Sequence, residues 1–397
     1  MKLANSKLPP SGLETPTRRL LLLGVAVVLI ASFTAIISSL LQRGRTIRST
    51  AQELSRTEAP ASRDGSVRMP PINVPFSSFA SPEAQAAFVQ NLSYMRMWAS
   101  VLWETRSITE QRRMEAAHFG PALERARALY PVTSVSSTIG GVHADVITPK
   151  DGIAPRNEKR VLISLHGGGF LFGAGVDSVL ESVPVASLGK IEVVSVDYRL
   201  APEYKYPAAS EDVVAVYREL LKSYKPENIG IYGCSAGGVL TAEAVAWFQK
   251  ENLPRPGAIG IFCASAGGWS GGDSASLAYP MNGYDVPASS ANSVHPSVTD
   301  APYFSNADLN DPLVEPIHSE QTLARFPPTL IVTSTRDIAL SPAVYTHTKL
   351  VQLGVDAELH VWEGLGHSFF TIYPDLPESK DVWRVVTEFF DRHLGVG

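Results

Sequence analysis

Short apolar runs alternate with longer amphipathic stretches over most of the chain beyond residue 160. The runs have the length and bounding glycines of buried strands, and the stretches between them have the three-to-four spacing of helices. Strands that alternate with helices indicate a mostly parallel sheet with helices on both faces. The expected strands are 161–165, 193–196, 229–232, 259–263, 330–333 and 359–362, and the expected helices are roughly 178–188, 208–224, 236–251, 342–353 and 380–393.

Other patterns flank and interrupt this alternation. Residues 82–130 carry apolar side chains at helical spacing in two stretches, which predicts two helices. The apolar runs 133–137 and 142–147 flank the dipeptide Gly140-Gly141, a pattern typical of a hairpin. Residues 266 to about 322 are rich in Gly, Ser, Pro, Asn and Asp and are too long for an ordinary connection. We expect them to form an insertion over a site, such as a lid.

The first 80 residues follow neither pattern. Residues 20–41 contain no charged side chain and would form a helix about 33 Å long, enough to span a bilayer. Three interpretations remain open: a single-pass membrane anchor, a cleaved export signal, or a buried helix. In the first two, the globular part would face the periplasm or exterior, or be secreted. Residues 42–80, rich in Arg, Ser, Ala and Pro, predict a linker, which makes 81–397 the folded domain.

Composition narrows the class of protein. The chain has 397 residues, of which 45% are hydrophobic and 18% charged, so it can bury a sizeable core and is not disordered throughout. The net charge of −5 gives no broad basic surface for a nucleic acid. The two cysteines, Cys234 and Cys263, are too few for a disulfide scaffold or a cysteine-rich zinc site.

The segment Gly233-Cys234-Ser235-Ala236-Gly237 fits the G-x-S-x-G pattern of a nucleophilic serine. It follows an expected strand and opens an expected helix. The serine of such a strained turn needs small neighbours two residues away on either side, and the helix N-terminus favours negative charge beside it. The pattern predicts Ser235 as the nucleophile. Cys234 is a rival whose side chain should point away from the cleft.

A glycine-rich loop, His166-Gly167-Gly168-Gly169, follows an earlier expected strand. An acyl-transfer intermediate carries an oxyanion, which backbone N–H groups stabilise, and glycines let the backbone approach it closely. A phosphate-binding loop is the rival interpretation, but the G-x-G-x-x-G spacing and the Walker lysine are both missing. We expect His166 to be a structural loop residue.

A nucleophilic serine needs a base, and the base needs an orienting carboxylate. His367 lies in a glycine-bearing loop after the last apolar run, and Asp337 lies at the end of the preceding one. Ligand sites of open α/β sheets gather at the carboxyl ends of strands. Ser235, Asp337 and His367 all fall at such ends, in the chain order Ser, Asp, His. Weaker acid candidates lie in the insertion: Asp300, Asp308 and Asp311.

Two further strings complete a recognisable set. Residues 197–203 read DYRLAPE, and residues 311–314 read DPLV with Pro316 after them. All these motifs together resemble the hormone-sensitive-lipase-like branch of the α/β-hydrolases, the bacterial family IV esterases, over about residues 84–395. The resemblance implies the α/β-hydrolase fold, a mostly parallel eight-stranded sheet flanked by helices, with a helical cap. The cap would come from about 84–130 and 266–322.

The resemblance also implies roles for single residues. It assigns the triad to Ser235, Asp337 and His367, the oxyanion hole to the backbone N–H groups of Gly168, Gly169 and Ala236, and supporting positions to His166, Gly167, Gly233 and Gly237. Many members have Asp or Thr where this chain has Cys234, and Asn where it has Val239. Neither residue performs acyl transfer, so these departures bear on acyl preference and pocket shape.

The sequence therefore predicts a lipase-like serine carboxylesterase that works through an acyl-enzyme, without a metal or other cofactor. Short- to medium-chain esters or small lactones are the substrates implied by the resemblance, and a monomer or homodimer is expected. One alternative is an amide or carbamate hydrolase on the same triad. Another is a non-catalytic receptor like the plant gibberellin receptors, although those have lost the catalytic histidine. Candidates for lining a pocket or packing a core are Trp98, Trp103, Phe170, Phe172, Trp269 and Tyr279.

Overall fold

The computed structural model describes residues 67, 69, 72–103, 107–268, 270–283 and 302–395, without the side chains of 93–103. One compact unit, Val74–Gly397, contains every element named below. It begins within the stretch expected to be a linker. Residues 20–41, the expected anchor or export signal, lie outside the described residues. Among the residues that are described, no helix is both long and apolar enough to cross a membrane.

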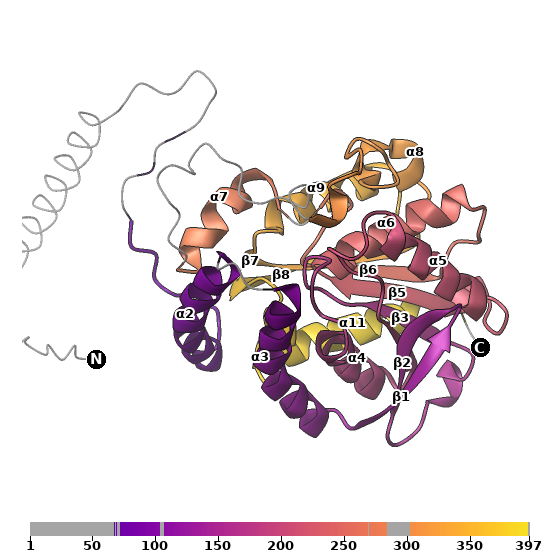
Figure 1. Ribbon diagram of the computed structural model, residues 1–397, viewed down its shortest axis with the longest axis horizontal. Coiled ribbons are helices and arrows are strands. Elements are labelled where there is room, and N and C mark those ends of the chain that lie inside the picture. The colour runs from indigo at the N-terminus through magenta and orange to yellow at the C-terminus, as the bar shows by residue number, and fades with distance from the viewer. Residues whose placement is uncertain are drawn as a thin grey trace, which may run out of the picture. The chain divides into compact units, whose positions relative to one another are not determined.

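A mixed eight-stranded sheet runs through this unit in the order β1-β2-β4-β3-β5-β6-β7-β8 (Figure 1). The β2 strand pairs antiparallel with both β1 and β4, and every other neighbouring pair is parallel. The mostly parallel sheet predicted from the sequence is thereby confirmed. The strands are β1 Val132–Ile139, β2 Val142–Pro149, β3 Val161–Leu165, β4 Glu192–Val196, β5 Ile229–Cys234, β6 Ala258–Phe262, β7 Thr329–Arg336 and β8 Ala357–Gly366.

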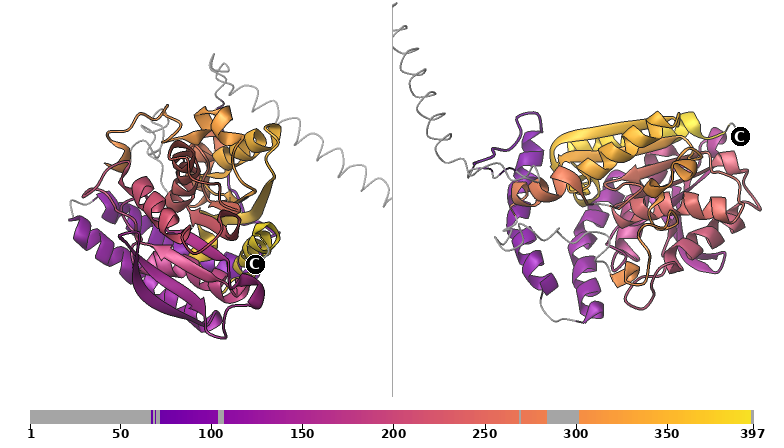
Figure 2. Two further views of the ribbon diagram at one scale, coloured as in Figure 1. Left: turned by 90° about the vertical axis from the view of Figure 1, so that its right-hand side faces the viewer. Right: turned by 90° about the horizontal axis from the view of Figure 1, so that it is seen from above.

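Helices cover both faces of the sheet, and each face has its own core cluster. On one face α3 and α11 both contact α4, and on the other α5 contacts α6 (Figures 1 and 2). Because both faces are covered, every residue of β3, β5 and β6 is buried, as their apolar sequences predict. The helices are α2 Pro82–Trp103, α3 Ile108–Leu129, α4 Val176–Gly189, α5 Ala208–Leu220, α6 Ala236–Lys250, α7 Gly272–Met281, α8 Glu320–Leu323, α9 Leu340–Gln352, α10 Phe369–Ile372 and α11 Pro377–His393.

Arg336, the last residue of β7, ties the segment before α2 and the end of α7 to the sheet. Its guanidinium donates to the carbonyl oxygens of Pro75, at 2.9 Å, and Met281, at 3.1 Å. It also lies 5.1 Å from the ring centroids of both Phe76 and Phe88. This buried side chain therefore joins the chain before α2, α2 itself and the end of α7 beside the carboxyl end of β7.

Replacing Arg336 by glutamine should lower the free energy of unfolding by about 1–3 kcal/mol, because the two hydrogen bonds of a buried guanidinium and its contacts with two aromatic faces are lost. Urea denaturation followed by tryptophan fluorescence would measure the change. Arg384→Gln is the matched control: among the described residues, this exposed arginine pairs with Asp381 and Glu388 alone, both on its own helix, and the loss should stay within about 0.5 kcal/mol. Equal effects of the two substitutions would contradict a tying role for Arg336.

Candidate active site

Three side chains meet at the carboxyl ends of parallel strands. Ser235 directly follows β5, Asp337 follows β7, and His367 follows β8. The Nε2 atom of His367 lies 2.9 Å from Ser235 Oγ, and its Nδ1 atom lies 2.6 Å from Asp337 Oδ1. An ionised carboxylate can only accept, so Nδ1 carries the proton and Nε2 accepts from the serine hydroxyl. The structure thus brings all three predicted triad residues into one line of hydrogen bonds.

The carboxyl group of Asp337 is fully buried and held by several donors. Burial, the largest single influence, would raise the pKa of Asp337, but the charge and the hydrogen bond of the neighbouring His367 act against it. The backbone N–H of Ala339, at 2.9 Å, and the Thr333 hydroxyl, at 2.8 Å, add to this effect. The pKa of Asp337 therefore lies below its ordinary value, and the residue stays ionised beside the imidazole.

The turn that carries Ser235 is strained and tightly packed. Ser235 has φ 55° and ψ −119°, which a side-chain-bearing residue rarely adopts and which is typical of functional turns. A Cβ atom at Gly237 would collide with the carbonyl oxygen of Leu165, and one at Gly233 with the backbone of Gly237. The two glycines of the pattern are thus required for α6 to start directly behind the serine.

The glycine-rich loop lies beside this turn. Gly168 and Gly169 have φ of 104° and 62°, in the region that favours glycine. Within the described parts of the chain, the N–H groups of Gly168, Gly169 and Ala236 donate to no other residue. An unpaired N–H group near a buried reaction site is costly unless a ligand or water accepts from it. The three groups are therefore available to an anion.

A family of α/β-hydrolase-fold proteins matches residues 162–371. The chain belongs to the α/β-hydrolase family. Esterase LipU of Mycobacterium tuberculosis is 31% identical to this hydrolase over 280 residues, which cover 69% of the hydrolase and 90% of the relative. An acetyl-hydrolase of Streptomyces hygroscopicus is 26% identical over 329 residues, covering 80% and 99% of the two chains.

Among solved structures, an esterase from the bacterial hormone-sensitive lipase family resembles the hydrolase with a TM-score of 0.65 and 26% identity. The match covers 79% of this chain and 99% of that one. The predicted fold and the resemblance to hormone-sensitive-lipase-like esterases are therefore confirmed.

His166 occupies a structural position in the hydrolase. It is fully buried, its ring stacks on Tyr198 at 4.2 Å, and its Nδ1–H donates to the carbonyl oxygen of Gly167 at 2.7 Å. Burial lowers the pKa of His166, which keeps the ring uncharged. The hydroxyl of Tyr198, from the DYRLAPE string, donates in turn to the backbone carbonyl of His166 at 2.6 Å. The DYRLAPE segment thus supports the glycine-rich loop through the hydroxyl of Tyr198.

The two cysteines are packed behind the triad. Cys234 Sγ lies 3.0 Å from Ser368 Oγ, and burial raises the pKa of the thiol, which keeps it protonated and poorly suited to nucleophilic attack. Ligand atoms of Cys263, Asp337 and His367 lie within 4.8 Å of one another, a spacing that could suit a metal ion. However, the imidazole and the carboxylate already bond to each other, and burial raises the pKa of the Cys263 thiol well above its ordinary value. The cluster is therefore arranged for hydrogen bonding.

The other acid candidates that the structure describes form hydrogen bonds within their own turns. Asp308 accepts from the backbone N–H of Asn310, and Asp311 accepts from that of Leu313. Asp300 lies outside the described residues. Among the pocket candidates, Phe170 is fully buried and stacks on Tyr303, so it packs the core. Phe172 and Tyr279 are half-buried, whereas Trp269 and the side chains of Trp98 and Trp103 lie outside the described residues.

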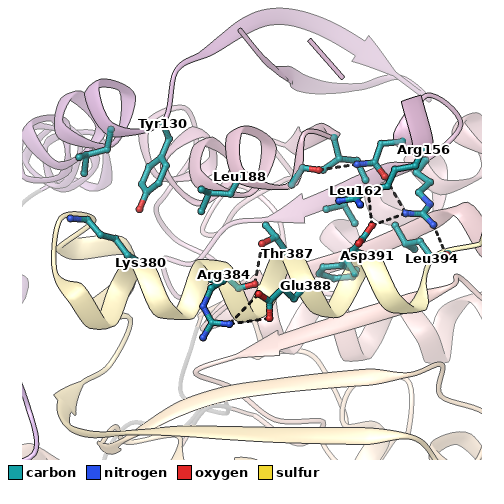
Figure 3. Close-up of a pocket in the computed structure, with 16 residues that line it drawn as sticks. Tyr130, Arg156, Leu162, Leu188, Lys380, Arg384, Thr387, Glu388, Asp391 and Leu394 are labelled. Carbon is teal, nitrogen blue, oxygen red and sulfur yellow. Dashed lines mark hydrogen bonds and ion pairs between the residues drawn. The ribbon is translucent and has the colours of Figure 1, made fainter. Parts of the chain in front are cut away.

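A groove of about 570 Å³ lies between α4 and α11, and none of the triad or oxyanion-loop residues lines it. Figure 3 shows Leu188 of α4 facing Thr387 and Glu388 of α11 across it. Arg384 at its edge pairs with Glu388 on the same helix, and Arg156 pairs with Asp391. Because it is lined by none of the residues at the strand ends, the groove is separate from the candidate active site.

Sequence reasoning missed the buried polar residues that support the site. Thr333 donates to Asp337, and Glu181 accepts from the backbone N–H of Gly167. One signal was present for Glu181. It is the only charged residue in the expected helix 178–188, which is otherwise composed of apolar and small side chains. A single acid in a buried helix must have polar partners.

Proposed function

We propose that this α/β-hydrolase cleaves carboxylic esters through an acyl-enzyme on Ser235. The observation that carries the proposal is the line of hydrogen bonds from Ser235 through His367 to the ionised Asp337. The relatives named as an esterase and an acetyl-hydrolase support ester bonds as the target.

The proposed reaction needs only groups already described. Ser235 Oγ attacks the ester carbonyl as His367 Nε2 takes its proton, and Asp337 holds the imidazole and stabilises its charged form. His367 then gives the proton to the leaving alcohol, and a water molecule, activated by the same imidazole, hydrolyses the acyl-enzyme. No step calls for a metal or an organic cofactor.

The developing oxyanion would accept from the N–H groups of Gly168, Gly169 and Ala236. Two observations support this assignment: the three groups donate to no other described residue, and Ala236 is the first residue of α6. A helix N-terminus adds a partial positive charge at this point.

We further propose small-molecule esters with short to medium acyl chains, or small lactones, as substrates. The acetyl-hydrolase relative supports a small acyl group. Membrane anchoring or export through residues 20–41 and a monomeric or homodimeric state stay predictions from the sequence.

Hydrolysis of a p-nitrophenyl ester series, from acetate to palmitate, by the full chain tests this range. We expect kcat/KM to be highest at or below the octanoate and about tenfold or more lower for palmitate, because a site shaped for a small acyl group excludes a long one. A value that rises up to palmitate would contradict the acyl range. Activity on p-nitroanilides or carbamates without activity on any ester would favour the amide or carbamate alternative.

A further inference from the structure

Three buried carboxyl groups stand behind the glycine-rich loop, and the proposed reaction uses none of them. Glu115 comes from α3, and Asp177 and Glu181 come from α4, each at most 8% exposed. In the described part of the chain, neither α4 residue forms an ion pair with a lysine, arginine or histidine. Burying a carboxyl group without a neighbouring cation costs free energy. Carboxyl groups perturbed in this way are concentrated at functional sites.

Glu181 contacts both chain segments that meet at the reaction site. Its Oε1 atom accepts from the backbone N–H of Gly167 at 2.9 Å. The backbone of Cys234 also acts on the same carboxyl group and lowers its pKa. Gly167 directly precedes the glycine pair of the oxyanion loop, and Cys234 directly precedes Ser235. One carboxyl group therefore bridges the loop and the nucleophile turn.

The packing around Gly167 leaves the loop little freedom. A Cβ atom at this position would lie 3.2 Å from the carbonyl oxygen of Cys234, 3.4 Å from Glu181 Oε1 and 3.5 Å from Ser235 Cβ. Gly167 thus packs directly against the glutamate and the nucleophile turn, with no room for a side chain between them. Oxyanion donors must be held within a few tenths of an ångström to be effective.

We propose that Glu181 is a positioning residue, whose carboxyl group fixes the spacing between the Gly167–Gly169 loop and the Ser235 turn. This role rests on the proposed ester hydrolysis. A neutral group can hold the loop without placing a negative charge behind donors that must bind an oxyanion.

The surroundings of Glu181 favour the uncharged acid. Burial raises the pKa of Glu181 to about 8, against the opposing effect of the hydrogen bonds from Gly167 and Cys234. The group is therefore neutral at pH 7 and becomes negative as the pH rises through 8. A charge formed there would repel the oxyanion and reduce kcat.

The ionisable groups that face Glu181 come from each element packed against it, and most stay uncharged near neutral pH. Burial raises the pKa values of Asp177, Tyr198, Tyr232 and Cys234, and lowers that of His166. On α3, Glu115 interacts with Asp177 and Arg112, and burial raises its pKa as well.

The test compares kcat of wild type, Glu181→Gln and Glu181→Leu for p-nitrophenyl acetate between pH 6.5 and 10. Glutamine keeps an acceptor for the Gly167 N–H but cannot ionise. We expect its kcat at pH 7 to lie within about threefold of wild type, and the wild-type decline above about pH 8 to be missing. Leucine leaves that N–H without a partner, and kcat should fall by about tenfold or more with little change in KM.

Glu243→Gln is the matched control. This second fully buried glutamate, on α6, also has a pKa raised by burial, but it is bonded to Ser210 Oγ at 2.8 Å and not to the loop. The control should keep the wild-type alkaline decline. Near-UV circular dichroism of each variant shows whether the fold is retained.

Two results would overturn the role of Glu181 alone: the same alkaline decline in Glu181→Gln as in wild type, or a wild-type kcat in folded Glu181→Leu. In both, the wild type would still hydrolyse the ester, and the proposed function would stand. A folded wild type inactive on every ester would instead overturn the proposed function together with this role.

Discussion

Ser235→Ala should lower kcat for p-nitrophenyl acetate by about 10⁵–10⁶-fold, because the variant has no atom that can form the acyl-enzyme. Labelling by a fluorophosphonate probe, which needs an activated serine, should disappear as well. The melting temperature should change little, since the substitution removes one hydroxyl group and leaves the packed glycines of the turn in place. Initial rates, probe labelling and thermal melting of the same preparation would measure all three quantities.

Cys234→Ser provides the control for this result. Its side chain packs behind the turn against Ser368, so the variant should keep probe labelling and most of its activity. If activity survived in Ser235→Ala and disappeared in Cys234→Ser, the cysteine would be the nucleophile. A folded wild type that neither reacts with the probe nor hydrolyses any ester would favour a ligand-binding receptor.

Asp337→Asn should lower kcat by about 10⁴-fold with a much smaller change in KM. The asparagine amide can donate to Nδ1 of His367, which favours the tautomer that carries its proton on Nε2 and so cannot accept from Ser235. It also removes the negative charge that stabilises the imidazolium in the transition state. Steady-state kinetics on a short-chain ester between pH 7 and 9 would measure the loss.

Thr333→Val tests the support of the Asp337 carboxylate independently of the carboxylate itself. The substitution removes one of the hydrogen bonds to Asp337 and leaves the charge, so kcat should fall by about tenfold or less. A loss of similar size in Asp337→Asn would mean that the carboxylate does not act on His367 as proposed.

The central strands could be predicted from the sequence almost residue by residue. The run 161–165 coincides with β3 because both of its faces are buried and every position is apolar or small. In contrast, the run 359–362 covers less than half of β8, Ala357–Gly366. This strand lies at the edge of the sheet, where Glu358 is only partly covered and Glu363 is exposed, so its polar ends have no apolar signal.

The residues of the candidate site could likewise be predicted from the sequence only in part. Ser235, Asp337 and His367 could be predicted because parallel topology alone brings the carboxyl ends of strands to one edge. Residues that hold the loop could not, because their partners are set by tertiary packing. Arg112, for example, donates to the carbonyl oxygen of Leu171, 59 residues away, and no local pattern relates the two positions.

The position of the triad at three strand ends ties reactivity to the integrity of the whole sheet. Ser235 and His367 are 132 residues apart in the chain, and they meet only when β6 and β7 have filled the space between β5 and β8. No local fragment can assemble the three groups, so an unfolded or half-folded chain should be chemically silent. On the proposed mechanism, Ser235 thus serves as a native-state reporter, and an activity assay on a destabilised variant would count folded molecules.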